Sequence, residues 1–166
     1  MAGRGIAALL GVVLGSFAGV LPASPASADS VRDSQWYLSV LNVAAAHGQS
    51  RGDGVTVAVL DSGVDANHPD LTGSVLEGAD SYTTGGNGQQ DPNGHGTAMA
   101  GIIAGHGHGA GNGSGVLGIA PAAKILPIKL GAGQRGASYA TTAVAAGVDA
   151  AVAKGAKVIS ASVDVA

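Results

Sequence analysis

Residues 55–60 form the feature that most limits the possible folds of this chain. They are a continuous run of mostly β-branched, apolar residues that follows a Gly-Asp-Gly turn. An unbroken apolar run of this length is typical of a strand that is buried on both faces of a parallel sheet. Residues 123–130 and 156–163 have the same character, and each run predicts another such strand.

Residues 140–154, between the last two runs, have the periodicity of an amphipathic helix. Three valines recur every fourth residue and so share one face of that helix. They are Val144, Val148 and Val152. Thr141 or Ser138 is expected to cap the start of the helix, and Gly155 to end it with a left-handed turn.

A second helix, made of small residues that could be buried, is expected over residues 97–105. Strand, helix and strand in succession over 123–163 make a right-handed βαβ unit. The predicted fold class is therefore α/β, with a parallel sheet and helices on both of its faces. The Gly-rich stretches 85–96 and 105–118 are predicted to be loops.

The first 28 residues have the pattern of a secretory signal peptide. Arg4 is followed by an apolar stretch, and Ala26-Ser27-Ala28 fits a small-residue cleavage site. A membrane anchor is the alternative, but the stretch is interrupted by glycine, whereas a span needs about 20 apolar residues. We therefore expect a secreted or extracytoplasmic protein with a signal peptide (1–28), a short N-terminal extension (29–50) and one domain (51–166).

The charge balance argues against nucleic-acid binding. The chain carries 8 Lys and Arg against 11 Asp and Glu, for a net charge of −3, and it has no basic run. Contacts to phosphates need clustered Lys and Arg. Because the chain has no cysteine, it must be held together by packing or by bound ions rather than by disulfides.

Two polar motifs carry the candidate chemistry. Asp61 directly follows the predicted strand 55–60, and His95 stands at the start of the small-residue helix. Because functional groups gather at the carboxyl edge of a parallel sheet, the two side chains are expected to meet there. A carboxylate and an imidazole are two thirds of a Ser-His-Asp triad. Either residue alone would more often be an ordinary turn aspartate or loop histidine.

Both motifs and their flanks resemble the subtilisin-like serine peptidases (subtilases). The matching segments are Asp61-Ser62-Gly63, His68-Pro69-Asp70-Leu71, His95-Gly96-Thr97, residues 100–105, residues 115–121 and residues 156–160. The resemblance covers residues 36–162 and implies that Asp61 is the orienting carboxylate and His95 the general base. Residues 31–38 resemble the N-terminal extension of the mycosins, the subtilases of type VII secretion. A polypeptide substrate and association with a membrane or secretion system are therefore implied.

The family's nucleophile lies in a Gly-Thr-Ser-Met-Ala block, and residues 1–166 contain no such block. The asparagine of the family's oxyanion hole is not found either, so we expect an N-terminal part of the fold that is incomplete at its C-terminus. In subtilisin itself, loss of the serine alone lowers kcat about 10⁶-fold. These residues alone are expected to be inactive and to aggregate. The alternatives are a degenerate, non-catalytic subtilase that binds peptides or a partner, and a chain without a stable fold.

The resemblance also implies residues that bind substrate. Gly136, in the loop 131–138, corresponds to one wall of the substrate cleft, although an ordinary Gly-rich connection explains this loop as well. Ser162 begins the run that pairs with the substrate backbone in the family. Asp164 stands where that run has glycine, which places a negative charge where substrate would lie.

No cofactor and no metal site are predicted. Asp70 matches a position that binds calcium in some subtilases, so calcium is the less favoured alternative. The family takes its other calcium ligands from the loop before Gly115, and that loop is longer here. His106 and His108, within it, could bind a transition metal, but two imidazoles in a Gly-rich loop are more often simply solvated.

Overall fold

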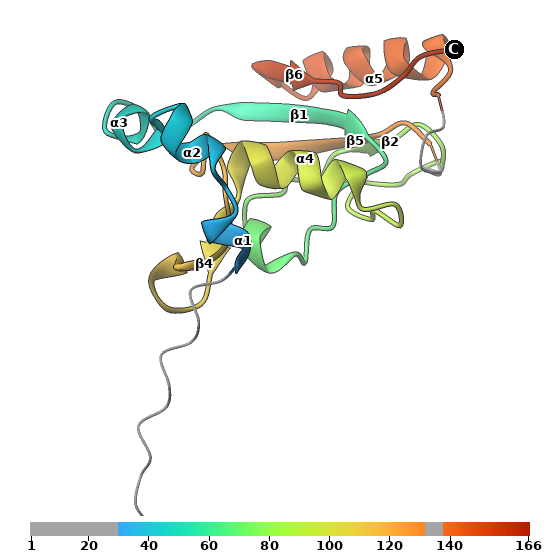
Figure 1. The fold of residues 1–166 in the computed structure, drawn as a ribbon. Helices are drawn as coiled ribbons and strands as arrows, with labels where there is room; N and C mark the ends of the chain where they lie inside the picture. Colours follow the sequence, from blue (N-terminus) through green and yellow to red (C-terminus); the bar gives the residue numbers. More distant parts are fainter. Residues whose placement is uncertain (1–29, 132–137) are drawn as a thin grey trace, which may run out of the picture.

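The computed structural model describes residues 30–131 and 138–166, and a four-stranded parallel sheet lies at its centre (Figure 1). The strands lie in the order β2-β5-β1-β6. Their bounds are β1 Thr56–Asp61, β2 Ala79–Asp80, β5 Lys124–Lys129 and β6 Val158–Ser160. The central strand β1 pairs with β5 along its full length, so that Asp61 lies beside Lys129. The predicted α/β fold with a parallel sheet is confirmed.

Helices cover both faces of the sheet, as the sequence predicts. Helix α4 (His95–Ala104) packs on one face, where Ala104 joins Val59 of β1 in a buried cluster. Helix α5 (Thr141–Ala153) packs on the other face, where Ala151 joins Leu60. Because successive side chains of β1 point to opposite faces, this one strand contributes to both clusters.

The valine face predicted for α5 is only partly confirmed, because Val144 packs against the buried cluster while Val148 and Val152 are 37% and 64% exposed. The buried residues of the helix are Gly147 and Ala151. Small residues lie at the contact because the helix approaches the sheet closely. A Cβ on Gly147 would lie 2.8 Å from Leu130 Cδ2.

The predicted cap of α5 is wrong. Ala140 holds the N-cap position, and it makes no side-chain capping bond. The hydroxyl of Thr141 instead donates to the carbonyl oxygen of Ala166 at 3.3 Å. The predicted end is confirmed, since Gly155 follows the helix with a φ of +82°.

The strand predicted over residues 156–163 is shorter in the structure. Strand β6 covers Val158–Ser160 and pairs with three residues of β1. It lies at the edge of the sheet, and Val158 and Ile159 are exposed there. Beyond it the chain pairs with a different segment, where Tyr139 N donates to Asp164 O at 2.8 Å.

The loop predicted over residues 105–118 is instead an antiparallel hairpin. It consists of β3 (His106–His108), the short 3₁₀ helix η2 (Ala110–Asn112) and β4 (Ser114–Leu117). The N-terminal extension holds this hairpin from one side. Gln35 is buried, donates to Leu117 O and accepts from Leu117 N, both at 2.9 Å.

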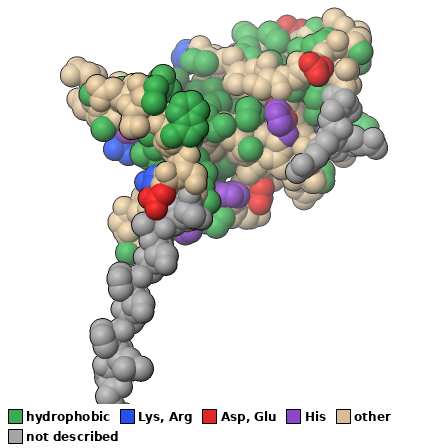
Figure 2. All heavy atoms as spheres, viewed as in Figure 1, with side chains coloured by type: hydrophobic (Ala, Val, Ile, Leu, Met, Phe, Trp, Pro, Cys, Tyr) green, Lys and Arg blue, Asp and Glu red, His purple; other side chains and the backbone are tan. Residues whose placement is uncertain are grey.

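The extension forms three short helices, α1 (Ser30–Asp33), α2 (Tyr37–Val40) and α3 (Val43–His47). Hydrophobic side chains gather on its exposed surface near α2 (Figure 2), where Trp36, Val40 and Leu41 are largely exposed.

Some sequence predictions lie outside the described residues. These are the signal peptide (1–28) and Gly136, and the division of the chain at residues 28 and 50 stays a prediction. In the part of the chain that the structure describes, every helix is too short or too polar to cross a bilayer.

Candidate active site

Asp61 and His95 meet at the carboxyl edge of the sheet. Asp61 is the last residue of β1, and His95 is the first residue of α4. His95 Nδ1 lies 2.9 Å from Asp61 Oδ1 and 2.8 Å from Oδ2. Because an ionised carboxylate only accepts, Nδ1 carries the proton and Nε2 is left with a lone pair. The Asp61 side chain is 2% exposed and the His95 side chain 47%, so the ring joins a buried charge to the surface.

A close approach between α4 and the end of β1 makes this pairing possible. A Cβ on Gly96 would lie 2.0 Å from Gly63 O and 3.0 Å from Asp61 Cβ. Gly63 itself has a φ of +107° and is packed against the backbone of Gln90. Glycine at these two positions therefore lets the first turn of α4 lie directly on the turn that follows β1.

The serine and threonine of the two motifs bind a third residue, Asp91. Ser62 N donates to Asp61 Oδ1 at 2.7 Å, while Ser62 Oγ donates to Asp91 Oδ1 at 2.7 Å. From the helix, Thr97 N and Thr97 Oγ1 donate to Asp91 Oδ2 at 2.8 and 2.6 Å. A further hydrogen bond links α4 to Ser62, because Gly96 N donates to Ser62 Oγ at 3.2 Å.

These contacts set the ionisation of Asp91. Burial alone would raise the pKa of its carboxyl group, but hydrogen bonds from Thr97, Ser62 and Gly94 outweigh burial and hold that pKa below its usual value. The pKa of Tyr139 is shifted in the opposite direction. Burial, together with the negative charges of Asp61 and Asp91, raises the pKa of its phenol.

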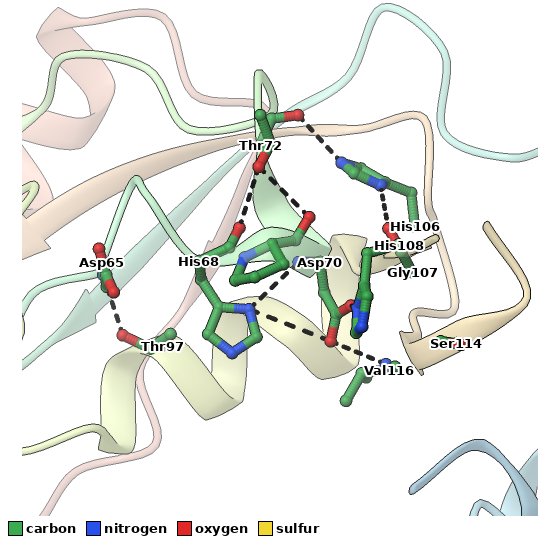
Figure 3. Close-up of polar contacts among 12 residues, drawn as sticks. Asp65, His68, Asp70, Thr72, Thr97, His106, Gly107, His108, Ser114 and Val116 are labelled. Atoms are coloured by element: carbon green, nitrogen blue, oxygen red, sulfur yellow. Dashed lines mark hydrogen bonds and ion pairs between the residues drawn. The ribbon is translucent and has the colours of Figure 1, made fainter. Parts of the chain in front are cut away.

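A second aspartate–histidine pair lies elsewhere in the molecule (Figure 3). Asp70 belongs to the 3₁₀ helix η1 (Pro69–Leu71), and His68 and His108 lie on either side of its carboxylate. His108 Nδ1 is 2.6 Å from Asp70 Oδ1, and Val116 N donates to Asp70 Oδ2 at 2.8 Å. His68 Nδ1 is more distant, at 4.0 Å from Oδ2.

The surroundings of Asp70 do not fit calcium. Both carboxylate oxygens already accept hydrogen bonds from the protein, and His108 offers nitrogen where calcium takes oxygen ligands. His106 does not join His108 in a metal site, because its ring nitrogens contact the carbonyl oxygens of Gly107 and Thr72. Across residues 30–131 and 138–166, no group of three or more acidic or histidine side chains suits a metal ion.

The structure does not place Ser162 in the strand that was predicted for it. Ser162 is exposed and lies beyond β6, outside any strand. Among the described residues, none places a hydroxyl group in hydrogen-bond contact with His95 Nε2. The nearby Ser62 is buried and its hydroxyl is bound to Asp91, so it is not a candidate nucleophile.

A cleft of about 770 Å³ runs beside this site, between the N-terminal extension and α4. Val31 and Tyr37 line one wall, and Ile102 the other. Asp65 and Asp91 lie along it, but neither Asp61 nor His95 does, so the paired groups are not inside this cleft.

Known proteins that resemble this chain identify its family. The subtilase family model (peptidase S8) matches residues 52–164. This chain belongs to the subtilase family. Subtilisin BL of Lederbergia lenta is 45% identical to this subtilase over 104 residues, which cover 61% of the chain and 36% of that protein. Thermitase of Thermoactinomyces vulgaris is 42% identical over 113 residues, which cover 68% of the chain and 38% of that protein.

Solved structures of mycosins share the fold of this subtilase. MycP1 from Mycobacterium smegmatis gives a TM-score of 0.63 at 30% identity, covering 84% of this chain and 37% of that one. A chain in the periplasmic assembly of the ESX-5 inner membrane complex gives 0.62 at 29% identity, covering 75% and 36%. The predicted resemblance to subtilases and mycosins is confirmed. This subtilase spans less than half the length of each of these relatives.

Sequence reasoning did not find Asp91. A signal for it exists, because Asp91 precedes His95 by four residues in Asp-Pro-Asn-Gly-His, and an aspartate just before a small-residue helix is a typical helix-start residue. Its second set of contacts, to the turn after β1, could not be predicted because that turn is far away in the sequence.

Proposed function

We propose that this subtilase supplies the aspartate and the general-base histidine of a serine endopeptidase. In this function a serine attacks the peptide carbonyl, and His95 Nε2 takes the proton from the serine hydroxyl. The same nitrogen then gives that proton to the leaving amine. Asp61 keeps the ring in the Nδ1–H tautomer and stabilises the imidazolium that forms.

The observation that carries this proposal is the contact of His95 Nδ1 with both oxygens of Asp61, at 2.8 and 2.9 Å. This contact leaves Nε2 as the ring nitrogen that can accept a proton. The ring is half exposed and lies at the sheet edge where α/β proteins bind their substrates. The match to the subtilase family supports the same chemistry.

We propose further that residues 1–166 do not hydrolyse peptides by themselves, because they contain no Gly-Thr-Ser block. A fluorophosphonate probe labels activated serines, and we expect it to leave the purified 166-residue product unlabelled. If the wild-type product is labelled and the His95→Ala variant is not, this part of the proposal is contradicted.

A chimaera with thermitase tests the Asp–His pair where a nucleophile is present. Residues 52–164 of this chain would replace the matching segment of thermitase. We expect His95→Ala to lower kcat about 10⁶-fold and Asp61→Asn about 10⁴-fold. His108→Ala is the matched control, since it removes the other histidine that contacts a buried aspartate, and it should leave kcat unchanged.

Equal losses from His95→Ala and His108→Ala would contradict the catalytic assignment. A chimaera that folds and binds a peptide inhibitor, but has no turnover before any substitution, would favour the alternative role as a binding module.

We propose that the protein works outside the cytoplasm, at a type VII secretion apparatus. The mycosin-like fold supports this, since one such relative is part of the ESX-5 periplasmic assembly. The signal-like first 28 residues add support from the sequence. Fractionation of cells that express the tagged protein tests the location, and recovery in the cytoplasm alone would contradict it.

A further inference from the structure

Asp91 joins two elements that must be aligned for the candidate pair to form. It lies in the segment between β2 and α4, and its carboxylate accepts hydrogen bonds from both sides. From α4 it takes Thr97 N and Oγ1, together with Gly94 N at 2.9 Å. Gly94, at the N-cap, has no side chain, so Asp91 satisfies the free N–H groups in its place.

The other side of Asp91 faces the end of β1. Ser62 Oγ donates to Asp91 and accepts from Gly96 N, so a single hydroxyl lies between the carboxylate and the first turn of α4. The backbone of Ser62 simultaneously donates to Asp61 Oδ1. The orientation of Ser62 therefore fixes one oxygen of the carboxylate that His95 contacts.

The segment that carries Asp91 is itself held by the sheet. Lys129, the last residue of β5, is buried and donates from Nζ to Gln90 O at 3.1 Å. Val64 N donates to Gly88 O at 2.9 Å, which fixes the same segment to the turn after β1. Asp91 thus approaches Ser62 from a position that the sheet determines.

We propose that Asp91 is a positioning residue that keeps the Asp61 carboxylate and the His95 ring aligned, by binding Ser62 of one motif and Thr97 of the other. Its meaning for catalysis rests on the function proposed above, but its effect on the ring does not. The role explains why a hydroxyl side chain stands next to Asp61 and another stands two residues after His95. Each hydroxyl donates to the same carboxylate.

The test observes the His95 ring directly and needs no turnover. Long-range ¹H–¹⁵N spectra of the full chain at about pH 8, where imidazoles are mostly neutral, give the ratio of the Nδ1–H to the Nε2–H tautomer. The His95 signals are assigned by their loss in His95→Gln. We expect the Nδ1–H form to dominate in the wild type and the ratio to fall about tenfold in Asp91→Asn, because a charge-assisted hydrogen-bond network is lost.

Two further variants separate positioning from helix capping. Ser62→Ala leaves the bonds from Asp91 to α4 intact and removes the link to β1, so we expect it to lower the ratio in the same direction. Asp65→Asn is the matched control. It removes a neighbouring negative charge whose carboxylate accepts only from Asn67 N among the contacts that the structure describes, and it should leave the ratio unchanged.

Each outcome supports or rejects the positioning role of Asp91. A lower melting temperature with an unchanged ratio in Asp91→Asn would show that Asp91 only caps the helix. A change in Asp65→Asn as large as that in Asp91→Asn would show a general charge effect, and would also overturn the proposal. If Asp91→Asn does not fold, Ser62→Ala decides alone, and a wild-type ratio there rejects the positioning role. Failure of the thermitase chimaera to hydrolyse peptides leaves all of these readouts unaffected.

Discussion

Two aspartate–histidine pairs in this molecule have nearly the same geometry. His95 Nδ1 lies 2.8 Å from Asp61 Oδ2, and His108 Nδ1 lies 2.6 Å from Asp70 Oδ1. In both pairs the aspartate side chain is almost fully buried and the histidine close to half exposed. Distance and burial therefore do not distinguish a candidate catalytic pair from a structural one.

The two carboxylates differ in what else they hold. Asp70 also binds Val116 N, so the second pair ties the β3–β4 hairpin to η1. Asp61 binds Ser62 N, and the surrounding network leads through Asp91 to the start of α4. The first pair stands at the carboxyl edge of a parallel sheet, and the second between a 3₁₀ helix and a hairpin. The two pairs therefore differ in the contacts around each carboxylate and not in the distance within the pair.

Gly96→Ala should have the largest effect and should break the first pair alone. Its Cβ would lie 2.0 Å from Gly63 O, so backbone must move and unfolding should become easier by about 3 kcal/mol. Gly101→Ala on the same helix is the control, since its Cβ would meet Val116 Cγ1 at an ordinary 3.7 Å. Urea unfolding gives the stabilities, and equal results for the two variants would disprove the close approach.

Gly115→Ala should break the second pair. Its Cβ would lie 2.0 Å from Asp70 Oδ1 at a φ of +76°, and we expect a loss of about 2 to 3 kcal/mol. Gly73→Ala is the control, because Gly73 has the same φ and nothing lies near its Cβ position. It should lower stability by the cost of backbone strain alone, about 1 to 2 kcal/mol. In Gly115→Ala the NMR signals of His108 should change and those of His95 should not. The reverse pattern would contradict the view that Gly115 supports the second pair alone.

Gln35→Ala tests whether the N-terminal extension supports the second pair alone. It leaves Leu117 N and O without the side chain that both now contact, which should lower stability by about 1 to 2 kcal/mol. Ser39→Ala, an exposed change in the same extension, should have almost no effect. We expect hydrogen exchange to rise in β4 while the amides of α4 keep their protection. Faster exchange in α4 would mean that the extension supports both pairs.

The smallest expected effect is the pH dependence of Asp91. Its pKa is lower in the folded chain than in the unfolded one, so the contribution to stability is complete above about pH 4 and is lost as the pH falls through the folded value. The difference in melting temperature between the wild type and Asp91→Asn should therefore shrink on acidification. A difference that grows below pH 4 would contradict the direction of the shift.

The elements that could be predicted from the sequence are those whose signal is local. The strands β1 and β5 are continuous apolar runs, and β1 is buried from Val57 to Asp61. The pairing of Asp61 with His95 was predictable because Asp61 ends a strand and His95 begins a helix, and functional groups gather at the carboxyl edge of a parallel sheet.

The features that were missed depend on distant contacts. The β3–β4 hairpin is Gly-rich and has no local strand signal, and it is held in place by Asp70 and by Gln35. Only Val144 of the valine face predicted for α5 packs on the core, and periodicity could not show this because it does not reveal how close a helix lies to a sheet. Here the close approach at Gly147 selects small residues instead.

The order of the strands has a consequence for how the chain folds. Strand β1 is made early in synthesis, but Val57 pairs with Ile125 and Val158, which are made much later. Until then, a strand that is apolar on both sides has no neighbour, and parallel pairing over such separations is slow. A chaperone that binds extended apolar segments would therefore find a binding site in β1 until β5 and β6 have been made.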